Sequence, residues 1–334
     1  MTIHDIETEH MVGEYKLLSH SKSKTWRRCP HQFYYKYILG YKPNEKSIYL
    51  ERGSWLHALL ETFYGGGDWG ERHKGLVHEF YGMFEEEREL LGELPDECER
   101  LMTSYIAKYK REDEGIKVID VELDEIVTLP NGLRFRMIVD KIIEEPDGGL
   151  WACDYKTVGR FLPSDFLLLD AQLARYFWGL EQLGYKPLRG IIYDELITKA
   201  PTLPKVLKNG KLERRANIHC DVYTYVRTMN SMGHSIKDPY YTKFVKRLKD
   251  REHEWFRRSR LAKDRPLTQR LMDELTMTAR EIKRAEETMS FPRSPMKDCQ
   301  WDCSFIGPCA ISLQGGDPQP VLDARFTRRS RKDE

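Results

Sequence analysis

Two runs of apolar and β-branched residues joined by a turn decide the fold of this chain. They read Leu133-Arg-Phe-Arg-Met-Ile-Val-Asp-Lys-Ile-Ile-Glu-Glu145, Pro146-Asp-Gly-Gly149 and Leu150-Trp-Ala-Cys-Asp-Tyr-Lys-Thr-Val158. Proline presets φ and glycine accepts positive φ, so the middle segment predicts a β-hairpin turn. If the strands pair symmetrically about Asp147, Asp140 lies directly opposite Asp154. Because side chains alternate along a strand, Asp154 and Lys156 share a face.

The two facing aspartates indicate a metal site. Like charges opposite each other destabilise a strand pair, and a divalent cation between the carboxylates removes that cost. Mg²⁺ and Mn²⁺ prefer oxygen ligands, and a bound cation can activate water for phosphodiester cleavage. Lys156 would then orient the water or neutralise the transition state. The alternative is a structural ion pair, but both aspartates interrupt otherwise apolar strands, which favours a site at Asp140, Asp154 and Lys156.

Three further polar residues lie on predicted helices. His57 follows Arg52-Gly-Ser-Trp-Leu on an amphipathic segment. Gln172 and Tyr176 are four residues apart, so they project from one helix face and would reach a nucleic-acid backbone near the metal. From their own spacing alone, packing accounts for His57 and Tyr176 better than a functional role does.

Composition limits the possible functions. The chain has 334 residues, a net charge of +1 and 32% charged residues, so no global field selects nucleic acid and any binding surface must be local. There is no long apolar run and no secretory signal at the start, which predicts a cytoplasmic protein without a membrane span. No phosphate-binding Gly-x-x-x-x-Gly-Lys-[Ser/Thr] loop occurs, which argues against a motor.

Helical and strand-like segments alternate along the chain. We expect helices over 21–37, 52–64, 71–112 and 164–183, and strands over 116–128, 133–144, 150–158 and 188–197. This order predicts the α/β class, with helices against a mixed sheet. The expected divisions are a lead (1–20), a core (21–200) with a helical insertion at about 65–115, a basic, mostly helical extension (201–292), a cysteine cluster (293–312) and a flexible basic tail (313–334).

The seven cysteines fit metal ligation better than a disulfide framework. Cys299, Cys303 and Cys309 are close together in a segment with Gly and Pro, which suits wrapping a metal or cluster. Three clustered thiols require a fourth ligand, and Cys29, within Arg-Arg-Cys-Pro, is the best candidate. Four thiolates can hold tetrahedral Zn²⁺ or an iron–sulfur cluster, and the residues alone do not decide between them.

Taken together and in order, these segments resemble the RecB-like branch of the PD-(D/E)XK nucleases, in particular its iron–sulfur members. Those include AddB-type nuclease domains, CRISPR-adaptation nucleases and phage exonucleases. The resemblance spans about residues 15 to 310. It consists of Cys29, Gly53-x-x-x-His57, Asp140, Asp154-Tyr-Lys156, Gln172-x-x-x-Tyr176 and three late cysteines. Cys299 and Cys303 are separated by three residues where many members have two, and the long 200–290 region favours a phage or recombination nuclease over the compact CRISPR type.

The resemblance implies a restriction-endonuclease-like core and a role for each matched residue. His57, Asp140, Asp154 and the backbone carbonyl of Tyr155 would bind Mg²⁺ or Mn²⁺, and Lys156 would be the catalytic lysine. Gln172 and Tyr176 would position DNA. The four cysteines, Cys29, Cys299, Cys303 and Cys309, would hold a [4Fe–4S] cluster.

A basic stretch from Lys243 to Arg270 carries interleaved aromatic residues. Cations that follow phosphates and aromatic rings that stack on unpaired bases are typical of single-strand binding, although a solvated helix face is equally consistent with this stretch alone. Given a nuclease core, we expect Arg257, Arg258 and Arg260 to guide a DNA strand.

The leading hypothesis is a metal-dependent DNA exonuclease that acts at single-stranded or duplex ends in recombination, repair or phage DNA processing. The expected setting is bacterial or phage-infected cytoplasm, with a recombination, helicase or CRISPR-adaptation protein as a candidate partner. The alternative is a catalytically silent iron–sulfur or zinc DNA-binding scaffold, although such proteins usually lose the lysine or a carboxylate that this chain keeps.

Overall fold

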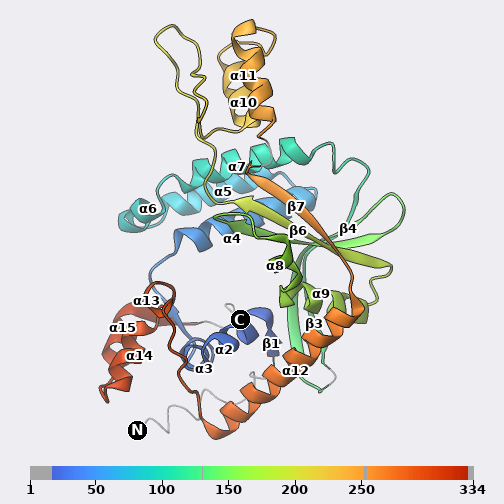
Figure 1. Cartoon of the computed structure of the whole chain (residues 1–334). Helices are drawn as coiled ribbons and strands as arrows, with labels where there is room; N and C mark the ends of the chain where they lie inside the picture. The colour runs from blue at the N-terminus through green and yellow to red at the C-terminus, as the bar shows by residue number, and fades with distance from the viewer. Residues whose placement is uncertain (1–16, 130, 252–253, 330–334) are drawn as a thin grey trace.

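A mixed six-stranded sheet forms the centre of the molecule (Figure 1). The computed structural model describes residues 17–129, 131–251 and 254–329. The strand order is β1-β4-β5-β6-β7, and β3 also pairs with β4. The strands are β1 (Leu17–Ser19), β3 (Lys117–Thr128), β4 (Arg134–Glu144), β5 (Leu150–Val158), β6 (Leu188–Ile197) and β7 (Phe256–Ala262). The α/β class and the mixed sheet predicted from the sequence are confirmed.

The β4–β5 hairpin forms with the predicted register and then forks, which the sequence did not predict. Its ladder runs from Glu144↔Leu150 to Lys141↔Cys153, which is the register expected from symmetric pairing about Asp147. Strand β3 pairs along one edge of β4. Strands β5 and β1 both pair along the other edge, and β1 does so only at residues 134–136 of β4. Asp140 and Asp154 come directly after the last hairpin pair, where the two strands separate.

Side-chain alternation along β4 also breaks at this point. Phe135, Met137 and Val139 belong to one core cluster, and Ile142 belongs to the same cluster although it is an odd number of residues away. A regular strand cannot place both Val139 and Ile142 on one face. The strand is therefore irregular at Asp140, which is typical of strands beside active sites.

Helices cover both faces of the sheet. On one face, α2 (His20–Arg28), α9 (Ala171–Gln182) and the long α12 (Arg265–Thr288) enclose the largest apolar cluster. On the other face, α4 (Ile48–Tyr64) and α7 (Leu94–Tyr109) enclose a second cluster that includes Tyr155 of β5. The short helices α5 (Trp69–Tyr81), α6 (Glu85–Leu91) and α8 (Ser164–Leu168) complete these layers.

The C-terminal segment returns to the N-terminal helices. After α13 (Cys299–Asp302) and α14 (Ile306–Leu313), α15 (Gln319–Arg325) leads into β8 (Phe326–Arg328). Strand β8 pairs antiparallel with β2 (Tyr41–Pro43). Helix α3 (Pro30–Phe33) and the π-helical turn η1 (Tyr34–Ile38) lie between α2 and β2. The prediction of a flexible tail over 313–334 is therefore wrong for 319–328, while 330–334 lie outside the described residues.

A basic arm projects from one end of the molecule (Figure 1). We use this name for residues 201–250, which include α10 (Val222–Ser231) and α11 (Pro239–Lys249). The expectation that 240–290 is mostly helical missed β7, whose residues pair with β6. The expected lead at 1–20 lies outside the described residues up to residue 16. None of the helices in the described part of the chain has the length and apolar character that crossing a membrane requires.

Candidate metal centre

Asp140 joins the forked hairpin to helix α4. Its Oδ2 accepts a hydrogen bond of 2.6 Å from the main-chain N–H of Tyr155. The ladder between β4 and β5 ends before this residue, so the carboxylate takes the place of a strand partner for that amide. Its Oδ1 lies 3.3 Å from Nδ1 of His57 on α4. The Asp140 carboxylate thus bonds to β5 where the strands separate and also faces helix α4.

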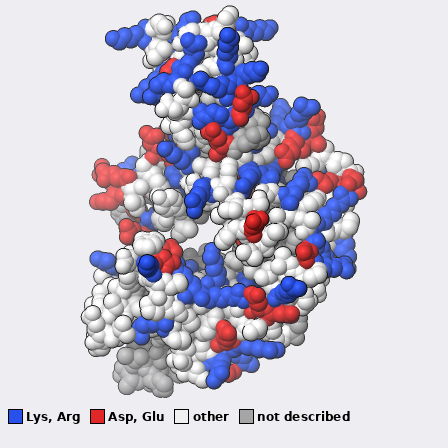
Figure 2. All heavy atoms as spheres, in the orientation of Figure 1, with Lys and Arg blue, Asp and Glu red and all other residues white. Residues whose placement is uncertain are grey.

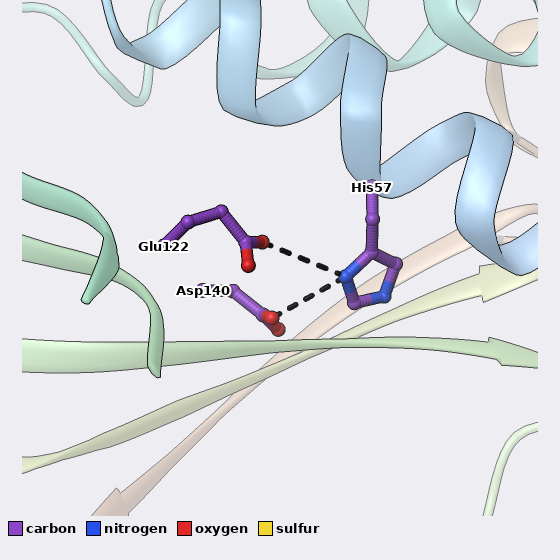
Figure 3. Close-up of side chains that lie close together, drawn as sticks. All are labelled: His57, Glu122 and Asp140. Atoms are coloured by element: carbon purple, nitrogen blue, oxygen red, sulfur yellow. Dashed lines mark ion pairs between the residues drawn. The ribbon is translucent and has the colours of Figure 1, made fainter. Parts of the chain in front are cut away.

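Glu122 completes a three-residue group with His57 and Asp140 (Figure 3). One ligand atom from each residue lies within 4.8 Å of the others, and Glu122 Oε1 is 3.9 Å from Nδ1 of His57. Burial lowers the pKa of His57, but the hydrogen bonds and charges of Asp140 and Glu122 outweigh it and raise the pKa to about 10. Without a cation, a proton on His57 therefore balances the two carboxylates.

Glu122 is the site residue that the sequence did not reveal. It lies on β3 between Val121, which pairs with Lys141, and Leu123, which pairs with Val139. The register thus places it opposite Asp140. Its φ of 48° is left-handed, which costs a residue other than glycine about 1–3 kcal/mol and is concentrated at functional sites. In the sequence it belongs to an alternating acidic stretch that is typical of a solvated strand.

Asp154 and Lys156 share a face of β5, as predicted. Lys156 Nζ lies 2.6 Å from Oδ2 of Asp154, whose side chain is 2% exposed. Burial raises the pKa of Asp154 to about 6, and the charge of Asp140 adds to this effect while Lys156 opposes it. Asp154 does not belong to the three-residue group formed with Glu122. Its ion pair with Lys156 holds it beside that group.

A short hydrogen-bond chain fixes the lysine. Lys156 Nζ donates to Oε1 of Gln172 at 3.0 Å, and Nε2 of Gln172 donates to the Tyr176 hydroxyl at 2.5 Å. Burial lowers the pKa of Lys156, but Asp154 and Asp140 outweigh it and the net shift is upward. The lysine is therefore held as an ammonium ion. Tyr176 is buried in the core cluster, so its ring packs and its hydroxyl supports Gln172.

A pocket of about 340 Å³ opens beside Gln172 and Tyr176. Four basic side chains contribute to its lining: Lys22, Lys36, Arg136 and Arg329. An anionic chain in this pocket would therefore meet positive charge next to Lys156. This convergence could not be predicted from the sequence, since these residues come from separate segments of the chain.

The structure brings Cys29 to the segment of three cysteines. Cys29 adopts an extended conformation between α2 and α3. Arg28 beside it forms ion pairs with Asp298 and Asp302, which flank the C-terminal cysteines. Burial raises the pKa of Cys303, and the nearby Cys299 and Cys29 add to the rise. The four thiols Cys29, Cys299, Cys303 and Cys309 are all free and half-buried.

The arginines of β7 form ion pairs with carboxylates. Arg258 has 8% of its side chain exposed and pairs with buried Asp194 and with Asp113. It also donates to the hydroxyls of Tyr64 and Tyr105. A guanidinium committed in this way has no donor for a phosphate, so its burial speaks against the strand-guiding role expected for Arg258.

The neighbouring residues of β7 differ in exposure. Arg257 pairs with buried Glu195, and Arg260, with 40% of its side chain exposed, pairs with Glu145 at 2.5 Å. The aromatic residues of the basic stretch (Phe244, Trp255 and Phe256) are buried in apolar clusters. The expectation that they stack on bases is therefore wrong.

Comparison with known families decides the classification of the chain. A family model of the PD-(D/E)XK nuclease superfamily matches residues 17–310. The chain belongs to the PD-(D/E)XK nuclease superfamily. It is also similar to the solved structure of a candidate exonuclease from Eubacterium rectale, with 11% identity, 91% of this chain and 98% of that chain covered, and a TM-score of 0.48. So distant a likeness carries no argument. No curated protein matches the sequence.

Membership of the PD-(D/E)XK superfamily supports a nuclease function, and its members use divalent metal ions. The residues of this chain fit such an ion. Two carboxylates and one imidazole converge within 4.8 Å, and either a proton on His57 or a bound cation would balance the two like charges. Carboxylate ligands suit Mg²⁺ and Mn²⁺, and an added imidazole is compatible with a transition metal such as Mn²⁺.

Proposed function

We propose that this PD-(D/E)XK nuclease is a metal-dependent DNA exonuclease that hydrolyses phosphodiester bonds at DNA ends. The observation that carries the proposal is the convergence of His57, Asp140 and Glu122 beside the Asp154–Lys156 pair. A group of ligands for a hard cation next to a half-buried ammonium ion supplies both elements that phosphodiester cleavage needs. A structural ion pair alone would not require Glu122 in a left-handed conformation.

In this proposal the metal ligands are His57, Asp140, Asp154 and the Tyr155 carbonyl, together with Glu122. When bound, Mg²⁺ or Mn²⁺ would stabilise the developing negative charge and lower the pKa of a bound water. Asp140 has a separate task, since it holds the Tyr155 amide at the fork. The charge of Asp140 also raises the pKa of Asp154, which supports placing both carboxylates at one centre.

Lys156 acts on the scissile phosphate as a cation. Its upward-shifted pKa keeps it protonated, which makes it a poor general base and a good electrostatic partner for a phosphorane. Gln172 accepts a hydrogen bond from Lys156 and donates one to Tyr176. These two residues therefore position the lysine, and the DNA strand enters through the adjacent cationic pocket.

The cysteines would place the chain in the RecB-like iron–sulfur branch. Cys29, Cys299, Cys303 and Cys309 offer four soft thiolates, which suit a [4Fe–4S] cluster or zinc.

Cleavage and binding can be tested separately with Asp154→Ala. The variant should bind DNA with an affinity close to that of the wild type, because the proposed entry pocket is intact, and it should lose Mg²⁺- or Mn²⁺-dependent cleavage. Undiminished cleavage by Asp154→Ala would refute the catalytic site. A wild-type protein that binds DNA without cutting it under any divalent metal would favour the silent scaffold.

A further inference from the structure

The basic arm is an insertion between two adjacent strands. Strands β6 and β7 are antiparallel neighbours whose ladder ends at Leu196↔Phe256, and the Ile197 N–H still bonds to the Trp255 carbonyl at 2.9 Å. A short turn would suffice to connect them. The chain instead leaves the sheet here, forms the arm and returns to the same point. The sheet itself therefore does not require the arm.

The arm has its own apolar core. Its buried cluster consists of residues from the loop, α10 and α11, including Leu212, Tyr225, Tyr241 and Leu248, and it contains no residue from outside the arm. The arm contacts α7 through several polar groups: Thr224 Oγ1 lies 3.3 Å from Ser104 Oγ, Arg227 donates to Thr103 Oγ1, and Arg100 donates to the Pro201 carbonyl. The arm is thus a small folded unit that rests on the outer side of α7.

Nearly all exposed charged side chains of the arm are positive. Ten of its lysine and arginine residues are exposed, and Asp250 is its single exposed carboxylate among residues 201–250, all of which the structure describes. Figure 2 shows the basic side chains gathered over this projecting unit. The whole chain has a net charge of only +1, so the arm concentrates positive charge that the rest of the molecule offsets.

Helix α11 shows how the charges are arranged. Tyr241, Phe244, Val245 and Leu248 face the arm's core. The exposed cations Lys243, Lys246, Arg247 and Lys249 alternate with them on the outer face. In the described part of the chain no carboxylate forms an ion pair with Lys243 or Lys246. The outer face is therefore a row of solvated cations with little to neutralise it.

The chemistry of this face fits a phosphate backbone more than unpaired bases. Single-strand binding surfaces combine cations with aromatic platforms, but Tyr225, Tyr241 and Phe244 are buried. Tyr240 is covered by Lys211 and Arg214, at 4.3 and 3.5 Å from its ring centre. A duplex has its bases stacked inside and carries a regular array of phosphate charges on its outside. Exposed cations without aromatic platforms can bind those phosphates.

We propose that the basic arm binds the backbone of duplex DNA away from the metal centre and holds the substrate while its end is processed. This inference rests on the proposed DNA nuclease function. The arm packs on α7, and α7 packs on α4, which carries His57. Helix α7 therefore lies between the arm and the helix that carries His57, so the arm's contacts are with DNA remote from the cleaved bond.

The test is the salt dependence of DNA binding by the full-length protein without divalent metal. The variant Lys243→Glu/Lys246→Glu/Lys249→Glu changes only exposed residues. It should weaken binding to a long duplex by about tenfold or more at low salt and reduce the slope of log K against log[salt] by about 2–3. Binding to a single strand of the same sequence should change less.

A matched control makes the same charge change elsewhere. Arg270→Glu/Arg280→Glu/Arg284→Glu alters three exposed cations of α12 and should leave the slope for duplex DNA nearly unchanged. A second arm variant, Lys205→Gln/Lys208→Gln on the loop, should weaken duplex binding in the same direction. An unchanged slope in the α11 variant overturns the proposal and favours an acidic protein as the arm's partner. An equal loss on single-stranded DNA overturns the assignment to duplex.

The experiments distinguish an error in the proposed role of the arm from an error in the proposed nuclease function. If the arm does not bind duplex DNA, wild type and the α11 variant digest long duplex equally well. If the nuclease function is wrong, neither protein cuts, while the α11 variant still binds duplex more weakly than wild type. If both are right, the α11 variant digests long duplex slowly and cuts a short oligonucleotide at the wild-type rate.

Discussion

Oδ2 of Asp140, one residue beyond the last pair of the β4–β5 ladder, accepts a 2.6 Å hydrogen bond from the main-chain N–H of Tyr155, two residues beyond that pair. This bond places a carboxylate in the gap that opens when the two strands separate. The opposite oxygen faces His57 at 3.3 Å. Asp140 thus connects the two strands where they separate and also lies at the centre of the candidate metal site.

Asp140→Asn should separate these two tasks. The amide oxygen of asparagine can still accept the Tyr155 N–H, so the melting temperature in EDTA should stay within a few degrees of the wild-type value. Loss of the negative charge should weaken Mn²⁺ binding by at least about 10-fold. This is the lower end of the range for removing a residue that supports a metal ligand. Calorimetric titration with Mn²⁺ measures this change, and wild-type affinity in the variant would contradict a role for Asp140 as a ligand.

Metal binding should depend on pH through His57. Because its pKa is raised to about 10 in the protein without metal, Mn²⁺ must displace a proton to use the imidazole. Affinity should therefore rise with pH, by close to tenfold per unit between about pH 6.5 and 8.5. In His57→Ala the affinity should be lower and the dependence much flatter. A wild-type affinity that is constant over this interval would exclude His57 as a ligand.

Lys156→Met should destabilise the metal-free protein more at high pH than at low pH. The pKa of Asp154 is raised to about 6 by burial, so the folded state holds this proton more tightly than the unfolded state does. Stability from this group is present at low pH and is lost as pH rises through the folded pKa. Without the lysine, the pKa of Asp154 in the folded state rises further. The loss of stability then continues to higher pH. Urea unfolding at about pH 5 and pH 8 measures the difference, and an equal penalty at both would contradict the buried ion pair.

Arg258→Met should unfold the protein more readily without acting through DNA. Removing this guanidinium leaves Asp194, which is 1% exposed, without its cation, and breaking a buried pair costs about 3–5 kcal/mol. The matched change Arg260→Gln breaks an exposed pair with Glu145 and should cost about 0–1 kcal/mol. Denaturant titration of both variants compares the two sites. Similar small losses in both would restore Arg258 as a candidate for DNA contact.

Cys303→Ser tests the cofactor proposed for the four thiols and should prevent its binding. Protein purified without oxygen should be brown and contain close to four irons per chain if the site holds a four-iron cluster. The variant should be colourless and less stable, because binding energy at this site also joins the two ends of the chain. Colourless wild-type protein that contains zinc would contradict the cluster and support the zinc alternative.

Local patterns in the sequence predicted the hairpin well. Pro146-Asp-Gly-Gly149 and its β-branched flanks specify both the turn and the register. The pairing of Asp154 with Lys156 also followed, since it needs only the alternation of a strand. These features depend on residues close together in the chain, which is why the sequence contained enough information.

Features that depend on distant residues were missed. Glu122 becomes a site residue only because β3 pairs with β4 opposite Asp140. Strand β7 is rich in arginine and resembles a charged helix, but it pairs with β6 and its Arg258 meets the buried Asp194. Residues 319–328 resemble a tail until β8 pairs with β2. In each case the tertiary partner, which the local pattern does not contain, decides the outcome.

The most direct test of the central claim is digestion of end-labelled DNA with Mn²⁺, comparing wild type with Lys156→Ala on single- and double-stranded substrates. Wild type should release short products progressively from an end. Lys156→Ala should bind the same DNA and cut it at least about 100-fold more slowly, the scale on which loss of one transition-state partner acts. Cleavage by Lys156→Ala at the wild-type rate would exclude a catalytic role for Lys156 and, with it, the proposed site.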